Sequence, residues 1–348
     1  MQRLKGLMLG LVLGIAPAQA RGAPKEKQEP PPPLPMARPD DTAGTAAFSG
    51  GVSAQFDITY ATPAGSVPLT LDIYRPQSKL PLPMPHPIIV YIHGGGWKSG
   101  DSRHALSFTD LPRALAGLAA QGYLVASVNY RLSPQVHFPT ALQDVKAAIR
   151  WLRGHAASYG GDATRLAVWG ASAGGQLAAM AGMSCGVMAF EPQNEGQQKR
   201  DYDAPSDCAE AVIDWFGPVD FENSTESDVA AYLGCAPKDC APAQVRQASP
   251  LTFISVNAPP FLIQHGAVDS DVLPSQAQML FDALKKKGVP VNLELYPDVG
   301  HGFMRDGKPD TATVTKAMAK LNAFLAATFP PAPVAKDRPR APTGRSRH

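Results

Sequence analysis

The amino-acid sequence predicts an α/β fold, built as a mostly parallel sheet with helices on both faces. Short apolar runs rich in β-branched and aromatic residues alternate with amphipathic helical runs along most of the chain. The chain has 348 residues, 44% of them hydrophobic, which is enough for one large buried core. The composition does not suit a collagen, a coiled coil or a globally disordered chain, so we expect one enzyme-sized domain.

Eight strands are expected. Gln55–Tyr60 and Pro68–Tyr74 have the pattern of an opening hairpin. The other six runs are short and apolar, as the strands of a parallel sheet covered on both faces are. They are Ile88–Ile92, Tyr123–Asn129, Arg165–Trp169, Val212–Phe216, Phe261–Gln264 and Val291–Tyr296.

Helical patterns fill the gaps between these strands. The clearest helix covers Pro139–Tyr159, followed by Ser275–Lys287 and Thr313–Thr328. In the first of these, one buried stripe keeps the i, i+3, i+7, i+10 spacing of a helix. Its members are Leu142, Val145, Ile149 and Leu152. The alternation of strands and helices, without an internal repeat, favours a parallel sheet.

Residues 1–20 have the features of a cleaved secretory signal peptide. Arg3 and Lys5 precede the apolar run Leu7–Ile15, and the segment ends in Ala-Gln-Ala, the small-x-small pattern of a cleavage site. An uncleaved anchor helix is the alternative, but the run is shorter than the ~20 residues that a membrane span needs. There is no cysteine near the cleavage site, so nothing there indicates a lipid anchor. We therefore expect a secreted or periplasmic protein without a membrane anchor.

Proline-rich segments flank the predicted domain, which spans residues 51–329. Residues 21–50 lack apolar periodicity and are expected to form a disordered spacer, and residues 330–348 a basic, disordered tail. The formal net charge is +2, but the leader contributes +2 and the tail +4. The body is therefore near −4 and offers no basic surface for nucleic acid.

All four cysteines lie in one third of the chain: Cys185, Cys208, Cys235 and Cys240. An even count in an exported protein predicts two disulfides, for which three pairings exist. We favour Cys185 with Cys208 and Cys235 with Cys240, because each pair closes one local insertion. A zinc site is the alternative, but neither a C-x-x-C motif nor a nearby histidine pair is present, so no metal is expected.

The pattern G-x-S-x-G, typical of a nucleophilic serine, occurs twice, around Ser172 and around Ser184. Ser172 follows a buried-strand pattern and precedes a helix of small residues. That order gives the tight strand-to-helix turn that exposes a nucleophile. Ser184 lies 12 residues further along, about 18 Å down the same helix, with no strand before it. Ser172 is therefore the predicted nucleophile.

A serine nucleophile needs a basic histidine, which a carboxylate orients. In the chain order Ser, Asp or Glu, His, the base follows the other two residues. His348 ends the predicted tail, and His265 leaves too little chain before it for a strand that carries the acid. His301 lies in a glycine-flanked loop after the last strand and is the predicted base.

The carboxylate is expected in the loop after the penultimate strand. This loop offers Asp269 and Asp271, and Asp298 lies close to His301 in sequence. One of the loop carboxylates is expected to be a solvated or helix-capping group. Asp269 is favoured, with the other two as alternatives.

The segment His93-Gly-Gly-Gly-Trp97 follows another predicted strand. Consecutive glycines let backbone N–H groups approach a ligand oxygen. Together with the N–H of Ala173, they would form an oxyanion hole for a tetrahedral acyl intermediate. His93 is expected to hydrogen-bond this loop rather than to act in catalysis.

These residues resemble the α/β-hydrolase superfamily, and within it the HGGG-type esterases related to hormone-sensitive lipase. The closer resemblance is to secreted bacterial esterases of the acetylxylan esterase and feruloyl esterase group, from about Val52 to Phe329. The motifs that carry it are HGGGWKSGD (93–101), VNYRLSP (128–134), FPTALQDVKAAIRWL (138–152), GASAGG (170–175), VIDWFGPVDF (212–221), SPLTFI (249–254), PPFLIQHGAVDSDVLP (259–274) and GHGF (300–303).

The resemblance implies an α/β-hydrolase fold with a central, mostly parallel, eight-stranded sheet and a Ser-His-Asp triad of Ser172, His301 and Asp269. The family's HGxxD motif falls on His265, Gly266 and Asp269, which supports Asp269 over Asp271. The resemblance further implies oxyanion donors at Gly94, Gly95 and Ala173.

Three departures from the family pattern stand out. Ala171 replaces an acidic residue common before the serine, and a long N-terminal cap is missing. The cysteine-bearing insertions 183–210 and 222–248 have no template and are expected to cover the site as a small lid.

The sequence thus predicts a secreted serine carboxylesterase that needs no cofactor. Its expected substrates are short-chain acyl or aromatic esters, small or attached to polysaccharide, bound beside Trp97. One alternative is an amidase, such as a formamidase, of the same fold, because the fold does not fix the bond attacked. A prolyl oligopeptidase-like peptidase would need an N-terminal propeller that the spacer cannot form. The other alternative is a non-catalytic binding module, which would be expected to lack a triad residue. The oligomeric state stays open.

Overall fold

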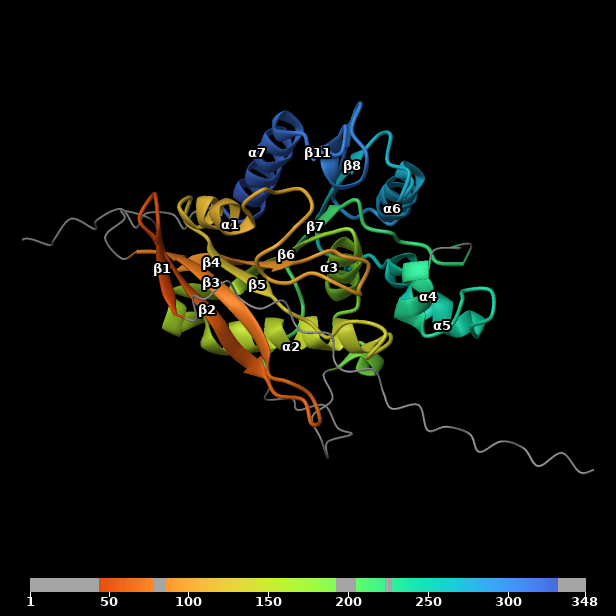
Figure 1. The fold of residues 1–348 in the computed structure, drawn as a ribbon, viewed down its shortest axis with the longest axis horizontal. Helices are drawn as coiled ribbons and strands as arrows, with labels where there is room; N and C mark the ends of the chain where they lie inside the picture. The colour runs from red at the N-terminus through yellow and green to blue at the C-terminus, as the bar shows by residue number, and fades with distance from the viewer. Residues whose placement is uncertain (1–43, 78–84, 192–204, 223, 225–226, 331–348) are drawn as a thin grey trace, which may run out of the picture. The chain divides into compact units, whose positions relative to one another are not determined.

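In the computed structural model the chain forms a nine-stranded sheet flanked by helices (Figure 1). The structure describes residues 44–77, 85–191, 205–222, 224 and 227–330. The predicted signal peptide, most of the predicted spacer and the predicted tail beyond residue 330 lie outside the described residues.

The strand order in the sheet is β1-β2-β3-β5-β4-β6-β7-β8-β9. The three leading strands are antiparallel, and the six from β5 to β9 run parallel. The strands are β1 Thr45–Phe48, β2 Val52–Ala61, β3 Leu69–Pro76, β4 His86–Ile92, β5 Leu124–Val128, β6 Gly161–Ala171, β7 Ala211–Trp215, β8 Phe261–Gly266 and β9 Val291–Tyr296. A separate two-stranded ribbon consists of β10 Met304–Arg305 and β11 Lys308–Pro309.

The central strands are apolar because both of their faces are covered. Every residue of β4, β5, β7 and β8 is buried. In such a strand the backbone N–H and carbonyl groups are hydrogen-bonded to the neighbouring strands, and the side chains on both faces are buried away from water. The predicted fold class is confirmed and each of the eight predicted runs forms a strand, but the sheet has nine strands instead of eight because β1 adds to its edge.

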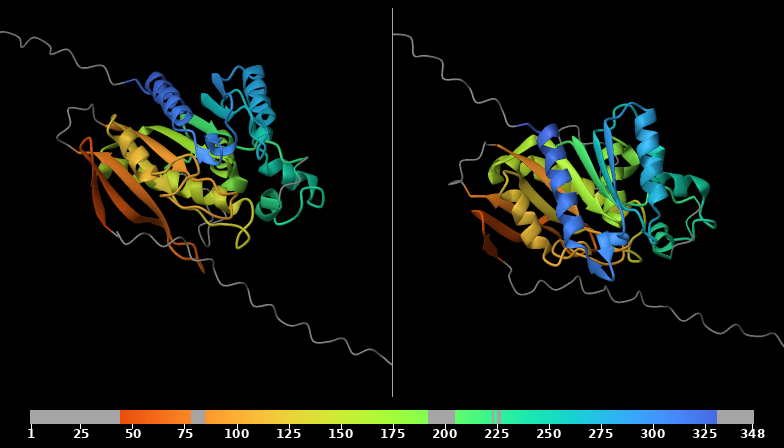
Figure 2. Two further views of the ribbon diagram at one scale, coloured as in Figure 1. Left: turned by 45° about the horizontal axis from the view of Figure 1, so that its top comes forward. Right: turned by 90° about the horizontal axis from the view of Figure 1, so that it is seen from above.

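Two helices cover one face of the sheet and three cover the other (Figures 1 and 2). On the first face α1 Leu111–Ala119 and α7 Thr311–Thr328 contribute to the core, and on the second α2 Thr140–His155, α3 Ala173–Met183 and α6 Pro274–Lys286 do so. The predicted stripe of α2 is fully buried, with all four residues at most 1% exposed. Three of these helices, α2, α6 and α7, are those that the sequence patterns predicted most clearly.

Helices α4 Ser227–Leu233 and α5 Pro242–Ala248 belong to the insertion before β8. Figure 2 shows them, in teal, at the end of the sheet away from β1 and β2 in both views. Each has seven residues, too few for a helical period to stand out in the sequence. Four short 3₁₀ turns complete the described elements, namely Ala156–Tyr159, Met188–Phe190, Pro250–Phe253 and His301–Phe303.

The first strand corrects the predicted end of the spacer. Residues 45–48 were assigned to the spacer, yet they form β1, which pairs antiparallel with β2. Gly50 and Gly51 both have positive φ and turn the chain back, while the Phe48 ring packs edge-on against Tyr74 at 5.7 Å. The glycine pair was the available signal for this hairpin.

Candidate active site

Ser172 lies at the sharp turn between β6 and α3, with φ 56° and ψ −123°. A non-glycine residue with positive φ is strained, and such strain persists only where the surroundings enforce it. Here the Ser172 N–H donates to the carbonyl of Trp215 at 2.8 Å, which anchors the turn to β7. Gly170 faces the backbone of Gly174 so closely that a Cβ would overlap it. The turn therefore requires small residues on both sides of the serine.

Two other residues reach Ser172 from the same edge of the sheet. His301 Nε2 accepts from Ser172 Oγ at 2.8 Å, and His301 Nδ1–H donates to Asp269 Oδ2 at 2.9 Å. The three residues follow β6, β8 and β9, which are parallel, so their carboxyl ends meet at one edge. The structure thus joins Ser172, His301 and Asp269 in one hydrogen-bonded chain.

Among the three candidate acids only Asp269 contacts the histidine. Its Oδ1 accepts the backbone N–H groups of Asp271 and Val272, each at 2.9 Å. Burial alone would raise the pKa of Asp269, but hydrogen bonds from His265, His301 and Val272 and the charge of His301 hold it well below its usual range. Asp271 and Asp298 are exposed. Asp269 is therefore a carboxylate at neutral pH, as an orienting group must be.

The His301 loop is held from two sides. The ring of Phe216 packs edge-on against His301, with 5.0 Å between ring centroids, and Gly302 adopts a positive φ beneath Leu106. Phe216 itself is buried with a φ of 44°. Sequence reasoning did not assign Phe216 a role, and no local motif signals it, because its contact with His301 spans 85 positions of the chain.

The glycine loop after β4 lies directly against the serine turn. A Cβ on Gly94 would lie 2.7 Å from the carbonyl oxygen of Ala171. Within the described part of the chain, the N–H groups of Gly94 and Gly95 donate to no other residue. Ala173 begins α3, so its N–H has no acceptor within the helix. Three backbone donors therefore border the cavity next to Ser172.

His93 supports this loop. Its Nδ1–H donates to the carbonyl of Gly94 at 2.7 Å, and its ring stacks on Tyr130 at 4.3 Å. Burial lowers the pKa of His93 to about 4, so the imidazole is neutral at pH 7. The residue hydrogen-bonds the loop, as the sequence predicted.

Trp97 is among the residues around the cavity, but its side chain belongs to the core. It is 2% exposed, stacks on Tyr232 of α4 at 4.5 Å and donates its Nε1–H to Gln176 at 3.2 Å. The prediction that substrate binds beside Trp97 stays a prediction: the residue borders the cavity, although its indole ring is almost entirely buried. Because α4 brings Tyr232 onto it, the ring anchors the glycine loop to the insertion.

A cavity of about 1210 Å³ opens over Ser172. Its apolar rim includes Leu106 and Leu273, each more than half exposed. Its polar rim includes the ion pair of Lys98 with Asp228, the latter from α4. The residues around the cavity are Gly94–Gly100, Arg103–Leu106, Phe108, Thr109, Leu111, Ala171–Ala173, Phe216, Pro218, Ser227, Asp228, Ser270–Leu273 and His301.

Both predicted disulfides are confirmed. The two insertions that contain them lie at different distances from the cavity. Cys235–Cys240 closes the insertion with α4 and α5, which borders the cavity through Ser227 and Asp228. Cys185–Cys208 joins the end of α3 to the segment that enters β7. None of the described residues of the insertion 183–210 borders the cavity, and residues 192–204 lie outside the described residues.

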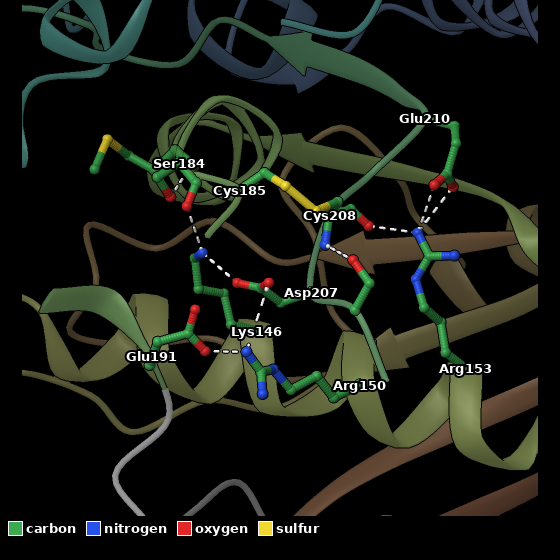
Figure 3. The surroundings of a disulfide bond; sticks show 11 residues. Lys146, Arg150, Arg153, Ser184, Cys185, Glu191, Asp207, Cys208 and Glu210 are labelled. Carbon is green, nitrogen blue, oxygen red and sulfur yellow. Dashed lines mark hydrogen bonds and ion pairs between the residues drawn. A yellow bond between two sulfur atoms is a disulfide. The ribbon is translucent and has the colours of Figure 1, made fainter. Parts of the chain in front are cut away.

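The Cys185–Cys208 disulfide lies beside a buried ionic cluster (Figure 3). Lys146 of α2 is fully buried, pairs with Asp207 and donates to the carbonyl of Ser184 at 2.7 Å. Arg150 of the same helix pairs with Glu191 and lies 3.6 Å from Asp207. Ser184 Oγ donates to the carbonyl of Met180 within its own helix. Ser184 therefore has a structural environment, remote from His301.

Among the described residues, no three His, Cys, Asp or Glu side chains gather as metal ligands would. No described helix is both long and apolar enough to cross a membrane.

Comparison with known proteins agrees with this architecture. The sequence profile of the family described as BD-FAE matches residues 71–284. Esterase LipC of Mycobacterium tuberculosis is 34% identical over 242 residues, which cover 67% of this chain and 56% of LipC. The ethyl acetate hydrolase of Pseudomonas putida is 30% identical over 264 residues, covering 72% of this chain and 76% of that protein.

A solved structure, a truncated form of a carbohydrate esterase from gut microbiota, superposes with a TM-score of 0.65 at 28% identity, covering 79% of this chain and 95% of the other. The chain spans a little over half the length of several curated relatives that it matches. The resemblance to esterases of the α/β-hydrolase superfamily, drawn from the sequence motifs, is confirmed.

Proposed function

Because the chain belongs to the BD-FAE family, we propose that it is a serine carboxylesterase whose nucleophile is Ser172. The observation that carries the proposal is the hydrogen-bonded chain from Ser172 through His301 to Asp269, next to three backbone donors. This arrangement has the parts that acyl transfer requires: an activated hydroxyl, an oriented base and donors for an oxyanion.

Acylation begins when Ser172 Oγ attacks the ester carbonyl carbon. His301 Nε2, at 2.8 Å, takes the hydroxyl proton as the carbon–oxygen bond forms. The carbonyl oxygen becomes an oxyanion, to which the N–H groups of Gly94, Gly95 and Ala173 donate. The tetrahedral intermediate then collapses, and His301 returns the proton to the departing alcohol. The acyl group remains on Ser172.

Deacylation repeats these steps with water. His301 takes a proton from a water molecule, whose oxygen attacks the acyl carbon, and then returns the proton to Ser172 Oγ as the acid leaves. Asp269 holds the tautomer in which Nδ1 carries the proton and Nε2 is free to accept one. Its low pKa keeps it charged, and the charge stabilises the imidazolium that forms in both halves of the reaction.

We place the substrates among short-chain acyl or aromatic esters, either small molecules or groups attached to polysaccharide. The cavity exceeds the common range for small-ligand pockets, about 300–1000 Å³, so it has room for a large alcohol component. Its rim offers both apolar and charged side chains. The name of the ethyl acetate hydrolase fits a small acyl group, and the name of the carbohydrate esterase fits a sugar hydroxyl as the alcohol component of the ester.

We further propose that the protein is exported after cleavage at Ala20. The pattern of residues 1–20 supports this, and so do the two disulfides, which are common in oxidising compartments.

Hydrolysis of p-nitrophenyl esters from acetate to decanoate, with methyl ferulate and acetylated xylan alongside, tests the proposed activity. We expect turnover that falls as the acyl chain lengthens. Ser172 is titrated in parallel with a fluorophosphonate, which labels an activated serine whatever the natural substrate. Labelling of Ser172 without turnover of any ester would overturn the esterase proposal in favour of an amidase. If a folded protein shows neither, the catalytic proposal itself fails.

A further inference from the structure

His265 is a buried residue of the HGxxD motif to which the proposed mechanism gives no task. It is the last residue but one of β8, directly before Gly266, and its side chain is completely buried. Its Nε2 lies 2.8 Å from the carbonyl oxygen of Val272 and 3.2 Å from Asp269 Oδ2. Both neighbours can only accept, so Nε2 carries the proton, which makes a shorter hydrogen bond to Val272 and a longer one to Asp269 Oδ2.

This donation completes the surroundings of the Asp269 carboxylate. Oδ1 accepts two backbone N–H groups, from Asp271 and Val272, and Oδ2 accepts from His301 and His265. A carboxylate has about four lone-pair sites, and here each oxygen receives two donors. His265 supplies the only side-chain donor to Asp269, within the described chain, apart from His301. The same N–H also donates to the carbonyl of Val272, so His265 holds both the carboxylate and the loop that carries it.

Asp214, on the neighbouring strand β7, lies close enough to His265 for the two side chains to interact electrostatically. Asp214 is paired in register with Ile263, two residues before His265, so both side chains lie on the same face of the sheet in diagonal positions. Asp214 is buried, and one of its oxygens accepts the Gly217 N–H at 2.9 Å. Within the described residues, the other oxygen and His265 Nδ1 have no hydrogen-bond partner. The hydrogen bonds of the His265 ring therefore all lie on the Nε2 edge, toward Asp269 and Val272.

We propose that His265 is a positioning residue for hydrolysis, because its Nε2–H sets the orientation of Asp269 toward His301. The inference rests on the proposed function, since it assigns Asp269 and His301 their tasks. Without this donor, the carboxylate keeps its backbone bonds at Oδ1 but can rotate Oδ2 away from His301 Nδ1. His265 is fully buried and does not border the cavity, so we expect the loss to fall on kcat rather than on KM.

Two nearly isosteric variants isolate the donated hydrogen. His265→Gln places an amide N–H near the position of Nε2, whereas His265→Met fills the same space without a donor. A hydrogen bond to a charged group supports roughly a tenfold or larger effect. We expect kcat for p-nitrophenyl acetate to fall about tenfold or more in His265→Met, with KM nearly unchanged. The Gln variant should stay within about threefold of the parent enzyme.

A matched control lies at the opposite edge of the same sheet, where the parallel strands begin. His86 begins β4, is also buried, and has an Nδ1 without a hydrogen-bond partner in the described structure. His86→Met should lower the melting temperature without lowering kcat. Equal kcat losses in the Gln and Met variants of His265, or no loss in either, would overturn the inference. If His265→Met does not fold, His265→Asn replaces it, because its shorter amide does not reach the position of Nε2.

The rate at which a fluorophosphonate labels Ser172 separates this inference from the proposed function. The reagent reports activation of the serine even if the enzyme hydrolyses no ester. Slower labelling in His265→Met than in His265→Gln supports the positioning role whatever the substrate. Equal labelling rates overturn it, even if the parent enzyme proves to be an efficient esterase.

Discussion

His301 Nε2 lies 2.8 Å from Ser172 Oγ, although 129 positions separate the two residues in the chain. The contact exists because β6 and β9 are parallel strands of one sheet, separated by β7 and β8, and their carboxyl ends meet at the same edge. The turn that exposes the serine and the loop that carries the histidine both begin at this edge.

Ser172→Ala should lower kcat/KM by a factor on the order of 10⁴ or more, because it removes the attacking oxygen. Ser184→Ala is the matched control from the second G-x-S-x-G match. Its hydroxyl only donates to Met180 within α3, so activity should stay near that of the parent enzyme. Steady-state kinetics on p-nitrophenyl acetate measures both. An inactive Ser184→Ala enzyme with an active Ser172→Ala enzyme would reverse the assignment.

Asp269→Asn should lower kcat by about 10⁴, because an amide at this position favours the wrong tautomer of His301. Asp271→Asn changes an exposed side chain and leaves the Asp271 backbone N–H that donates to Asp269. Its kcat should remain within about threefold of the parent value. The two variants have the same change of charge, so their comparison isolates position. Similar kcat losses in both would contradict the assignment of the acid.

Gly94→Ala should lower kcat by about 10²-fold or more. The new Cβ would lie 2.7 Å from the Ala171 carbonyl oxygen, so the loop must shift. Its N–H groups would then no longer point toward the oxyanion. Gly117→Ala is the control, because a Cβ there meets no atom within 4 Å and Gly117 lies in α1. It should keep full activity and gain roughly 0.5–1 kcal/mol of stability. Unchanged kcat in Gly94→Ala would argue against the oxyanion role of this loop.

Asp214 should make the stability of the parent protein depend on pH. Burial raises the pKa of Asp214 to about 7, whereas an unfolded aspartate titrates near about 3.9. The folded state therefore binds the extra proton between these values, and stability from this group is lost as the pH rises from about 4 through about 7. Asp214→Asn has no such titration and keeps an oxygen acceptor for the Gly217 N–H.

Melting temperatures of the two proteins at pH 5 and pH 8 test this dependence. The difference, variant minus parent, should be larger at pH 8 than at pH 5. Parallel pH profiles would show that Asp214 carries the same charge in the folded and unfolded states.

The two disulfides should stabilise the fold by different amounts. Cys185 and Cys208 are 23 positions apart, and Cys235 and Cys240 are 5 apart. Loop-closure entropy then predicts losses of about 3 and about 2 kcal/mol when each pair is replaced by serines. Urea unfolding of the two double variants measures the difference. A larger loss for the shorter loop would mean that local packing, not chain entropy, dominates.

Much of the fold could be predicted because its signals are local. The buried strands are continuous apolar runs, and the α2 stripe has a helical period, so each is visible in a short window of sequence. The serine turn, the glycine loop and the order of serine, acid and histidine are equally local or depend only on chain order. The disulfide pairing followed from the closeness of each cysteine pair in sequence. The β1 hairpin had a signal too, in Gly50 and Gly51, but it lies in a segment of spacer-like composition.

The tertiary structure decided what depends on neighbours distant in the chain. Asp269 and Asp271 are two positions apart; the motif resemblance favoured Asp269, but only the packing of the His301 loop shows that it contacts the histidine. Trp97 follows three glycines and borders the cavity, but the stacking of Tyr232, from a distant insertion, on its ring could not be foreseen from the sequence. His265 was visible in the sequence only as a motif residue, and its contact with Asp269 depends on how the loop after β8 folds back on that strand. Sequence thus determined eight of the strands, the longer amphipathic helices and the reactive residue types. Burial and hydrogen bonding depend on all spatial neighbours of a residue, so only the folded chain decided them.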